Sequence, residues 1–530
     1  MSCPTELATL PVCPGLFYAT PARDGIISRI RIPGGIINSQ QGRAIAEFAE
    51  DFGEGYVHVT NRANLQIRKI QGITPEVLTT LQKVGLAATL TEVDHLRNIM
   101  ASPTAGIDSL ELIDTRPWVR ELDAYICGHP ELKGLSPKFS VAFDGGGAVR
   151  VCDRPNEIIF RAMSCDKPFG FGGSQSTGSG ATAVDGSPGI KQVASKTATP
   201  SPLCVYALSE DCAAVEKNIY FQLILGDATN ILLQPKECLS VVVAIAQVYL
   251  DNVDQTKKSK LRLKHLLQDK GVEWYLQQAQ GYLPFSLLKR LKPTLDQSIN
   301  PKNYNHLGVH PQRQAGLSYI GIILPLGQLL SKQLHSLTDL AQTYGSGTLR
   351  LTPWQNLLIS DIPNSSIPQV KDEIECLGLD WNANHIQGSL VACTGKTGCT
   401  SSATDTKKQA LALADYLKKH ITLDVPVKIH FSGCPKSCAY HGKSDITLLG
   451  TLIEKDKTVV EGYHIYVGDK EQSFGRELYT NVCIPEVPHR ILQMLEVYQI
   501  KRTEPDESFG EFTNRYTIPQ LRQLFDESGQ

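Results

Sequence analysis

The sequence predicts a mixed α+β and α/β protein of several domains, built in part from a duplicated half-domain. A chain of 530 residues exceeds what one hydrophobic core normally packs. Its content of 42% hydrophobic and 20% charged residues is typical of a globular enzyme. A segment near the start also recurs after residue 320. The net charge of −2 gives no general attraction to nucleic acid or anionic membranes, so we expect neither partner.

The repeat aligns residues 31–67 with residues 323–359 without a gap, each position matching the one 292 further on. Each copy has the pattern of a strand, a helix, a glycine turn and two more strands. Two distant copies indicate a pseudo-two-fold pair and not a solenoid, whose repeats are contiguous. We therefore expect one half-domain over 20–90 and another over 305–375, with a ligand between them.

The rest of the chain is expected to form two further domains and a tail. Residues 91–300 predict an α/β domain, interrupted by a Gly/Ser-rich insertion at 170–203 that has no strand before it to form a dinucleotide site. Residues 376–500 predict a second domain, which carries most of the clustered cysteines. Residues 501–530 read as a polar C-terminal cap with short helices.

Cysteine usage indicates a metal site. The start of the sequence lacks the basic and apolar regions of a signal peptide, and the apolar run at 239–250 is too short to span a bilayer, so a cytoplasmic protein is expected. In that compartment the 14 cysteines are free, catalytic or metal-bound. Four of them cluster in the sequence: Cys393, Cys399, Cys434 and Cys438.

The segments between the two cysteine pairs predict that the pairs meet. Residues 404–420 have the pattern of an amphipathic helix, and 425–431 that of a strand leading to Cys434. A helix that returns to a neighbouring strand brings both loops to the same end of a sheet. Four thiolates there could hold a 4Fe–4S cluster or zinc, or remain unliganded. The five-residue, glycine-containing gap between Cys393 and Cys399 favours the cluster.

The Cys-x5-Cys and Cys-x3-Cys pairs in a Gly-Cys-Pro context resemble the sulfite/nitrite reductase superfamily. The resemblance implies duplicated ferredoxin-like half-domains plus two α/β domains of the sirohaem/4Fe–4S type. It also implies that the four cysteines bind a 4Fe–4S cluster and that Cys438 bridges it to the iron of a sirohaem.

The resemblance extends to basic stretches that would surround a tetrapyrrole. Such a ring carries many carboxylates, which arginine matches well. By resemblance, Arg62, Arg97 and Lys138 face the substrate on the open side of the ring. Ser140 stands where sulfite reductases carry a second lysine, which counts against sulfite. The residues expected to contact the cofactor are Asn64, Arg68, Asn356 and Cys438.

Short stretches divide between two members of the superfamily. VCPGLFYATPARDG (12–25), FDGGG (143–147) and RLTPW (350–354) look like precorrin-3B synthase. CTGK, VHPQRQAGLSYIG and PVKIHFSGCP look like nitrite reductase. We interpret the chain as a precorrin-3B synthase-like oxidoreductase of cobalamin biosynthesis, oxidising precorrin-3A with O2 by C20 hydroxylation and lactone formation. The alternatives are a ferredoxin-dependent nitrite or sulfite reductase and a non-catalytic cluster-bearing redox or tetrapyrrole-binding protein.

These interpretations imply different occupants of one pocket. The tetrapyrrole would be precorrin-3A as substrate or sirohaem as cofactor, beside the 4Fe–4S cluster. The synthase interpretation adds a mononuclear non-haem iron, for which no ligands are assigned. Because no flavin or NAD domain is recognisable, electrons are expected from an external ferredoxin or reductase.

Overall fold

The structure is a computed structural model. It describes residues 14–18, 20–70, 72–164, 219–254, 261–289, 306–440, 442, 444–455, 457–468 and 474–527. The predicted insertion at 170–203 lies outside the described residues.

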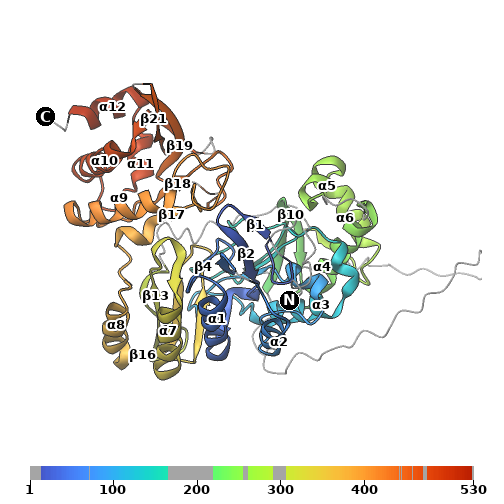
Figure 1. The fold of residues 1–530 in the computed structure, drawn as a ribbon. Helices are drawn as coiled ribbons and strands as arrows, with labels where there is room; N and C mark the ends of the chain where they lie inside the picture. Colours follow the sequence, from blue (N-terminus) through green and yellow to red (C-terminus); the bar gives the residue numbers. More distant parts are fainter. Residues whose placement is uncertain are drawn as a thin grey trace, which may run out of the picture.

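The first half-domain is a five-stranded antiparallel sheet covered by two helices (Figure 1). Its strand order is β1-β2-β5-β4-β14. The strands are β1 (Thr20–Ala22), β2 (Gly25–Ile30), β4 (Tyr56–Val59), β5 (Leu65–Arg68) and β14 (Gln328–Leu330), and the helices are α1 (Ser39–Phe52) and α2 (Pro75–Lys83). Asn38 and Gln41 form a capping box that fixes the start of α1, because each side chain accepts a hydrogen bond from the backbone N–H of the other.

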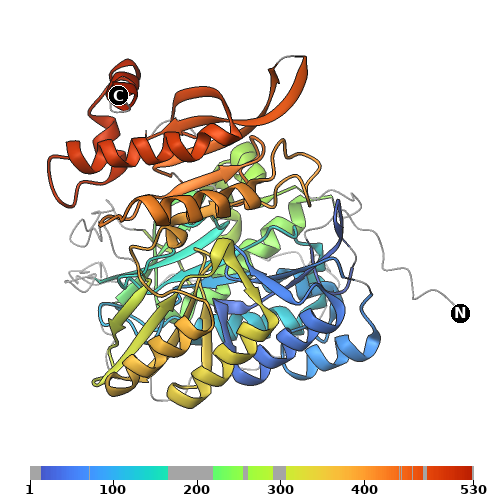
Figure 2. The same ribbon diagram turned by 60° about the vertical axis from the view of Figure 1, so that its left-hand side comes forward.

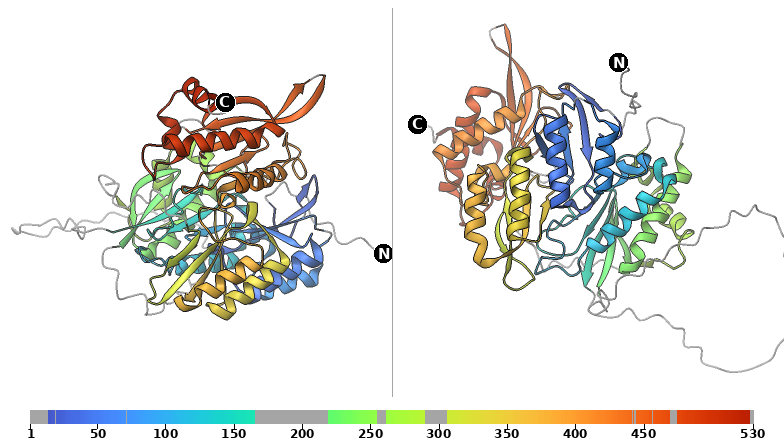
Figure 3. Two further views of the ribbon diagram at one scale, coloured as in Figure 1. Left: turned by 90° about the vertical axis from the view of Figure 1, so that its left-hand side faces the viewer. Right: turned by 60° about the horizontal axis from the view of Figure 1, so that its bottom comes forward.

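The second half-domain repeats this arrangement with the order β12-β13-β16-β15-β3. Its elements are β3 (Ile36–Asn38), β12 (Gly308–Pro311), β13 (Leu317–Ile322), β15 (Thr348–Leu351), β16 (Leu357–Pro363), α7 (Ser331–Tyr344) and α8 (Ile367–Cys376). The half-domains exchange strands: β3 of the first copy pairs with β15 of the second, and β14 of the second pairs with β4 of the first. Helices α1 and α7 lie side by side beneath the two sheets (Figure 3).

The first α/β domain has the sheet order β11-β10-β9-β8-β7-β6. Strands β6, β7 and β8 are parallel, and β9, β10 and β11 continue the sheet antiparallel. The elements are β6 (Ile99–Ala101), β7 (Val141–Asp144), β8 (Ile158–Ser164), β9 (Ile219–Leu225), β10 (Asp227–Leu233), β11 (Leu288–Lys289), α3 (Arg116–Gly128), α4 (Cys238–Asn252), α5 (Leu263–Lys270) and α6 (Val272–Gln280).

The second α/β domain repeats the topology of the first, with the order β17-β18-β19-β20-β21 and the same parallel start. It lies above the half-domains in Figure 2. Its elements are β17 (Leu390–Ala392), β18 (Ile429–Ser432), β19 (Ile446–Lys455), β20 (Thr458–Val467), β21 (Arg476–Cys483), α9 (Thr406–His420), α10 (Val487–Lys501), α11 (Phe509–Asn514) and α12 (Ile518–Glu527). The duplication therefore includes the α/β domains, beyond the stretch that is visible in the sequence.

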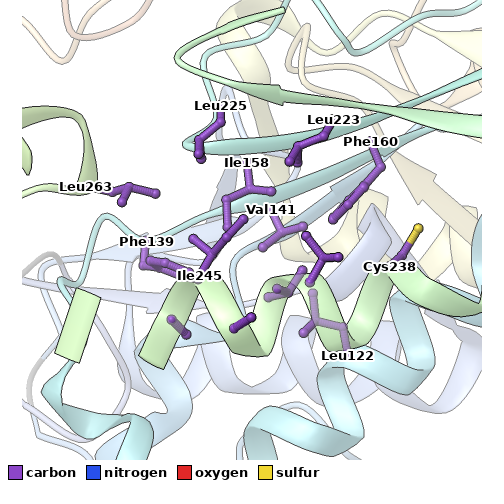
Figure 4. Close-up of a cluster of buried hydrophobic side chains, with 14 of the residues drawn as sticks. Leu122, Phe139, Val141, Ile158, Phe160, Leu223, Leu225, Cys238, Ile245 and Leu263 are labelled. Atoms are coloured by element: carbon purple, nitrogen blue, oxygen red, sulfur yellow. The ribbon is translucent and has the colours of Figure 1, made fainter. Parts of the chain in front are cut away.

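Three large hydrophobic cores hold these layers together. One fills the first α/β domain, where α4 packs on the sheet and Cys238 is fully buried (Figure 4). Another fills the second α/β domain, and the third is shared by both half-domains. None of the described helices is both long enough and apolar enough to cross a bilayer. The expected fold class, duplicated ferredoxin-like half-domains plus two α/β domains, is confirmed.

Candidate redox and anion-binding site

The structure places the four clustered cysteines at one edge of the second α/β sheet. Cys393 directly follows β17, and Cys399 lies on the loop before α9. Cys434 and Cys438 follow the neighbouring parallel strand β18. Burial, and next the charges of the other three cysteines, raise the pKa of Cys438, so the other three thiols lie close enough to Cys438 to influence it.

The loops around Cys393 are shaped to solvate a thiolate. The backbone N–H of Gly433 donates a hydrogen bond to Cys393 Sγ at 3.2 Å. The Thr406 hydroxyl lies 3.5 Å from the same sulfur and donates to the Cys393 carbonyl at 2.8 Å. Gly395 and Ser437 adopt left-handed backbone conformations, with φ of 79° and 51°, which turn the two loops. Hydrogen bonds to ligand sulfurs tune the potential of a metal centre.

Four cysteine thiolates are the ligand set of a 4Fe–4S cluster. Among the described residues, no three His, Cys, Asp or Glu side chains are arranged around one point as a mononuclear site requires. In a 4Fe–4S cluster each cysteine binds a different iron, so the sulfurs need not converge on a point.

A cavity of about 170 Å³ opens beside this edge, between the first half-domain and the cysteine loops. Cys393 and Cys438 line it, together with the cationic side chains of Arg29, Arg68 and Lys407. The site thus combines thiols with a concentration of positive charge, which suits an anionic ligand next to a redox group.

Arg68 connects the first half-domain to the cysteine loops. It forms an ion pair with Asp24 through two hydrogen bonds of 2.6 and 2.8 Å. Its Nη2 also donates to the carbonyl of Gly398, one residue before Cys399, at 3.2 Å. The pair holds the pKa of Asp24 below its ordinary value, mainly through the hydrogen bond and charge of Arg68 acting against the effect of burial.

Lys407 carries a positive charge that no carboxylate balances directly. Its Nζ lies 3.1 and 3.3 Å from the two ring nitrogens of His58, and no carboxylate pairs with it among the described residues. Burial, and next the charge of Arg68, lower the pKa of Lys407 to about 8. Burial and Lys407 in turn lower the pKa of His58 well below its ordinary value. A half-buried cation without a carboxylate partner fits an anionic group in the cavity, such as a ring carboxylate.

Of the three residues expected to face the substrate, two have other side-chain partners in this structure and the third is exposed. Arg62 donates to Asn156 Oδ1 and to the Pro155 carbonyl, both at 2.8 Å. Arg97 is buried and forms an ion pair with Asp123 at 2.8 Å. Lys138 is exposed on the turn before β7. None of the three is among the residues that line the cavity.

Asn64 and Asn356, expected to contact the cofactor, shape equivalent loops in the two copies. Asn64 Oδ1 accepts a hydrogen bond from the Ile32 N–H at 2.8 Å, and Asn356 Oδ1 accepts one from the Leu324 N–H at 3.3 Å. In the repeat, positions 32 and 64 correspond to 324 and 356, so the two hydrogen bonds are equivalent. Neither asparagine lines the cavity, whereas Arg68 and Cys438 do.

Arg29 and Lys407 were not predicted from the sequence, although both line the cavity. Arg29 lies on β2 between the buried residues Ser28 and Ile30, so its side chain is on the opposite face of the strand. Lys407 lies in the first turn of α9. A cation there opposes the helix dipole. This unfavourable placement is the sequence signal that marks Lys407 as a candidate functional residue.

Fold and site together define a duplicated α+β protein with four clustered cysteines beside a cationic pocket. The family model of the nitrite/sulfite reductase ferredoxin-like half domain matches residues 20–84 and 310–376. That of the nitrite and sulphite reductase 4Fe-4S domain matches 92–193, in the first α/β domain. The chain belongs to the nitrite/sulfite reductase superfamily and is an oxidoreductase of that family.

Similar proteins share most of the chain. The ferredoxin–nitrite reductase of Synechococcus elongatus is 31% identical over 494 residues, covering 92% of this chain and 86% of that protein. The chloroplastic ferredoxin–nitrite reductase of Zea mays is 30% identical, covering 86% of this chain and 75% of that protein. The structure of the Mycobacterium tuberculosis NirA protein superposes with a TM-score of 0.72 at 22% identity, covering 94% of this chain and 85% of that one.

The expectation of a precorrin-3B synthase is wrong. The relatives that share most of the chain are named ferredoxin–nitrite reductases, in cyanobacteria and in plants, and none of them is named a precorrin-3B synthase. Precorrin-3A, O2, a non-haem iron and a place in cobalamin biosynthesis are therefore unsupported. The stretches that resemble the synthase are short, such as residues 143–147, whereas the similarity to nitrite reductases extends over most of the chain.

Proposed function

We propose that the protein is a ferredoxin-dependent nitrite reductase that carries sirohaem and a 4Fe–4S cluster. The observation that carries the proposal is the cavity where Cys393 and Cys438 meet three cationic side chains. Full-length similarity to ferredoxin–nitrite reductases supports it. When bound, the two groups would supply electron storage and an iron centre for a small oxyanion.

In this proposal the cysteines and the cationic residues have separate roles. Cys393, Cys399, Cys434 and Cys438 hold the cluster, and Cys438 faces the tetrapyrrole cavity. Arg29, Arg68 and Lys407 bind ring carboxylates, because they provide positive charge at the wall of the cavity.

Arg62, Arg97 and Lys138 remain predicted substrate-facing residues. Arg62 would have to exchange its partners Asn156 and Pro155 for the ligand. Arg97 would likewise have to leave Asp123. Substitution of each by glutamine tests the roles, since a substrate-facing cation should affect nitrite KM or turnover while sirohaem content stays unchanged.

Nitrite is favoured over sulfite by the residue at position 140. Ser140 is buried, and its Oγ accepts a hydrogen bond from the Glu157 N–H at 3.3 Å. A neutral hydroxyl there provides less positive charge than a lysine, which suits a monoanion better than a dianion. Ferredoxin is proposed as the donor because the similar enzymes are named for it.

The first test is anaerobic purification followed by an absorption spectrum, iron and sulfide analysis, and assays of nitrite and sulfite consumption with reduced ferredoxin. We expect sirohaem absorption, cluster iron and preferential consumption of nitrite. Cys434→Ser should lose the cluster, with Cys376→Ser, an exposed cysteine elsewhere, as the control. A protein that binds cluster and sirohaem but consumes no nitrite would overturn the proposal, and full cluster content in Cys434→Ser would overturn the ligand assignment.

A further inference from the structure

A second cavity, of about 440 Å³, lies between the first α/β domain and the half-domains. It is lined by Arg116 and Arg120 from α3 and by Arg350 from β15. It is separate from the cavity beside the cysteines and shares no lining residue with it. A volume of this size is in the range of small-ligand sites.

The second cavity occupies the position that the duplication makes equivalent to the first. In the half-domain repeat, Arg350 corresponds to His58 and Gly34 to Leu326, at the offset of 292. In the α/β domains, Arg116 and Lys407 each lie in the first turn of the helix that follows the first strand of the sheet. All of these positions line one cavity or the other. The described loop that joins β6 to α3 contains no cysteine, and Cys152 on the β7–β8 loop does not line the cavity, so this cavity has a cationic wall without thiols.

Arg350 forms the buried floor of the second cavity and is 2% exposed. Its Nε donates to Ser360 Oγ, and its Nη1 donates to the carbonyls of Pro103 and Ala105 at 3.1 and 2.8 Å. Its Nη2 has no hydrogen-bond partner in the described part of the chain. Burial, and next the charge of Arg116, lower the pKa of Arg350 to about 10, which indicates two guanidinium groups close together.

The carboxylates nearby do not neutralise this charge. Arg116 forms an ion pair with Asp114 at 2.7 Å. Asp361, which lines the cavity, accepts hydrogen bonds from Gln312, Ser346 and Ser360. Arg120 is exposed and makes no ion pair or hydrogen bond with any described residue. Three guanidinium groups therefore face three carboxylates, Asp114, Asp361 and Glu111. Asp361 is already satisfied by neutral donors, and burial raises the pKa of Glu111 to about 7, so that it carries only part of a charge at neutral pH.

We propose that this cavity binds a small anion carrying two oxyanion groups, at a site distinct from the redox centre. Guanidinium groups are well suited to phosphate and carboxylate, and Arg350 Nη2 and Arg120 supply donors that the protein does not use. One anionic group would lie on the buried floor at Arg350, and the other would lie at the rim with Arg120. Because α3 and β15 come from different copies, a bound anion would stabilise their association.

The test uses the holoenzyme with sirohaem and cluster in place, so that ring carboxylates already occupy the cations of the first cavity. Isothermal titration at a constant ionic strength of about 0.15 M is carried out with pyrophosphate and, separately, with succinate. One-to-one binding of either probe is expected, and the probe that binds tells phosphate chemistry from carboxylate chemistry.

Arg120→Gln should weaken binding of that probe about tenfold, as loss of one charge-assisted hydrogen bond does. Arg43→Gln is the matched control, because the Arg43 side chain is 40% exposed and its partner Asp339 lies outside both cavities. Arg120→Glu, at an exposed position that should not affect folding, should abolish binding. Nitrite consumption should be the same in all three variants, so this test does not depend on the proposed activity.

Binding of neither probe would overturn the proposal. Equal affinity in Arg120→Gln, Arg120→Glu and Arg43→Gln would also overturn it. Loss of binding in Arg29→Gln alone would place the anion in the first cavity and would equally overturn it.

Discussion

At the scale of single residues, Lys407 is the clearest indication that the cavity is built for an anion. Its ammonium group contacts the His58 ring and has no carboxylate partner among the described residues. Its pKa of about 8, against an ordinary value of 10.5, means that the charged form is disfavoured while the cavity contains no anion. At pH 7 this shift corresponds to a destabilisation of the apoprotein by roughly 3 kcal/mol.

Lys407→Met should therefore have opposite effects on two properties. The apoprotein should melt at a higher temperature, because the uncompensated charge is gone, whereas sirohaem per protein should fall after reconstitution. Thermal unfolding measures the melting temperature, and absorbance measures the sirohaem content. Lys408→Met, the exposed neighbour on α9, is the control and should change neither. Full sirohaem content in Lys407→Met would refute a role in binding the ring.

His306 should make the stability of the folded protein depend on pH. His306 is buried, and its ring centroid lies 4.8 Å from that of Trp354. Burial is the main cause that lowers its pKa to about 3. In the unfolded chain the pKa returns to about 6.5, so below that value the unfolded state binds a proton that the folded state does not. Stability is therefore lost as pH falls from 6.5 towards 3, by up to about 1.4 kcal/mol per pH unit.

The comparison that isolates this effect is the melting temperature of wild type and His306→Gln at pH 7 and pH 5.5. The variant should be less stable at pH 7, but its melting temperature should fall less between the two pH values. An identical fall in both proteins would mean that His306 does not contribute to the acid sensitivity.

At the scale of elements, the turn after β18 holds the cysteine loops in contact. Gly433 donates its N–H to Cys393 Sγ, and a Cβ at this position would lie 1.8 Å from Ser402 Oγ. No side chain fits there without displacing the loop that carries Cys399.

Gly433→Ala should therefore lose most of the cluster, as measured by iron and sulfide content, while the far ends of the domains stay folded. Replacing Ser402 by glycine in the same protein removes the nearest clashing atoms and should restore part of the cluster. Gly128→Ala is the control, because a Cβ at the end of α3 meets nothing within 4 Å. Normal iron content in Gly433→Ala would show that the turn tolerates displacement.

Much of the element pattern can be predicted from the sequence, because it is local. The half-domain repeat, the helix at 404–420 and the strand before Cys434 follow from hydrophobic periodicity and turn residues. The exchange of β3 and β14 could not be predicted, since nothing within a three-residue strand specifies which copy it pairs with. The resemblance predicted two α/β domains, but it did not reveal that they repeat one topology, because similar topology can persist after side chains diverge.

The site could be predicted only in part, because some of its contacts depend on how segments distant in the sequence pack together. The spacing of the four cysteines predicted a cluster site, and Arg68 was predicted from residues 60–68. The ion pair of Arg97 with Asp123 depends on how β6 and α3 pack, which sequence spacing does not reveal. Arginines around a tetrapyrrole serve precorrin and sirohaem alike, so the cations could not distinguish substrate from cofactor, and the wrong choice of synthase followed.

At the scale of the whole molecule, the half-domains are two copies joined into one body. They share one hydrophobic core, and each sheet is completed by a strand of the other. Expressed alone, residues 1–297 should lack β14 and leave the edge of β4 unpaired, which promotes aggregation.

Co-expression of residues 1–297 with 298–530 should yield a soluble complex that co-purifies, whereas each fragment alone should be insoluble. Co-purification through a tag on one fragment tests this. A soluble, monomeric 1–297 fragment with cooperative unfolding would show that the exchanged strand is dispensable.

The exchange of strands also sets a delay during synthesis. Strand β4 emerges with residues 56–59, but its partner β14 consists of residues 328–330. At about 5–20 residues per second, the ribosome needs roughly a quarter of a minute to a minute to make the intervening chain. For that time a nascent sheet edge has no permanent neighbour, so the newborn chain is an expected client of ribosome-associated chaperones well before its redox site exists.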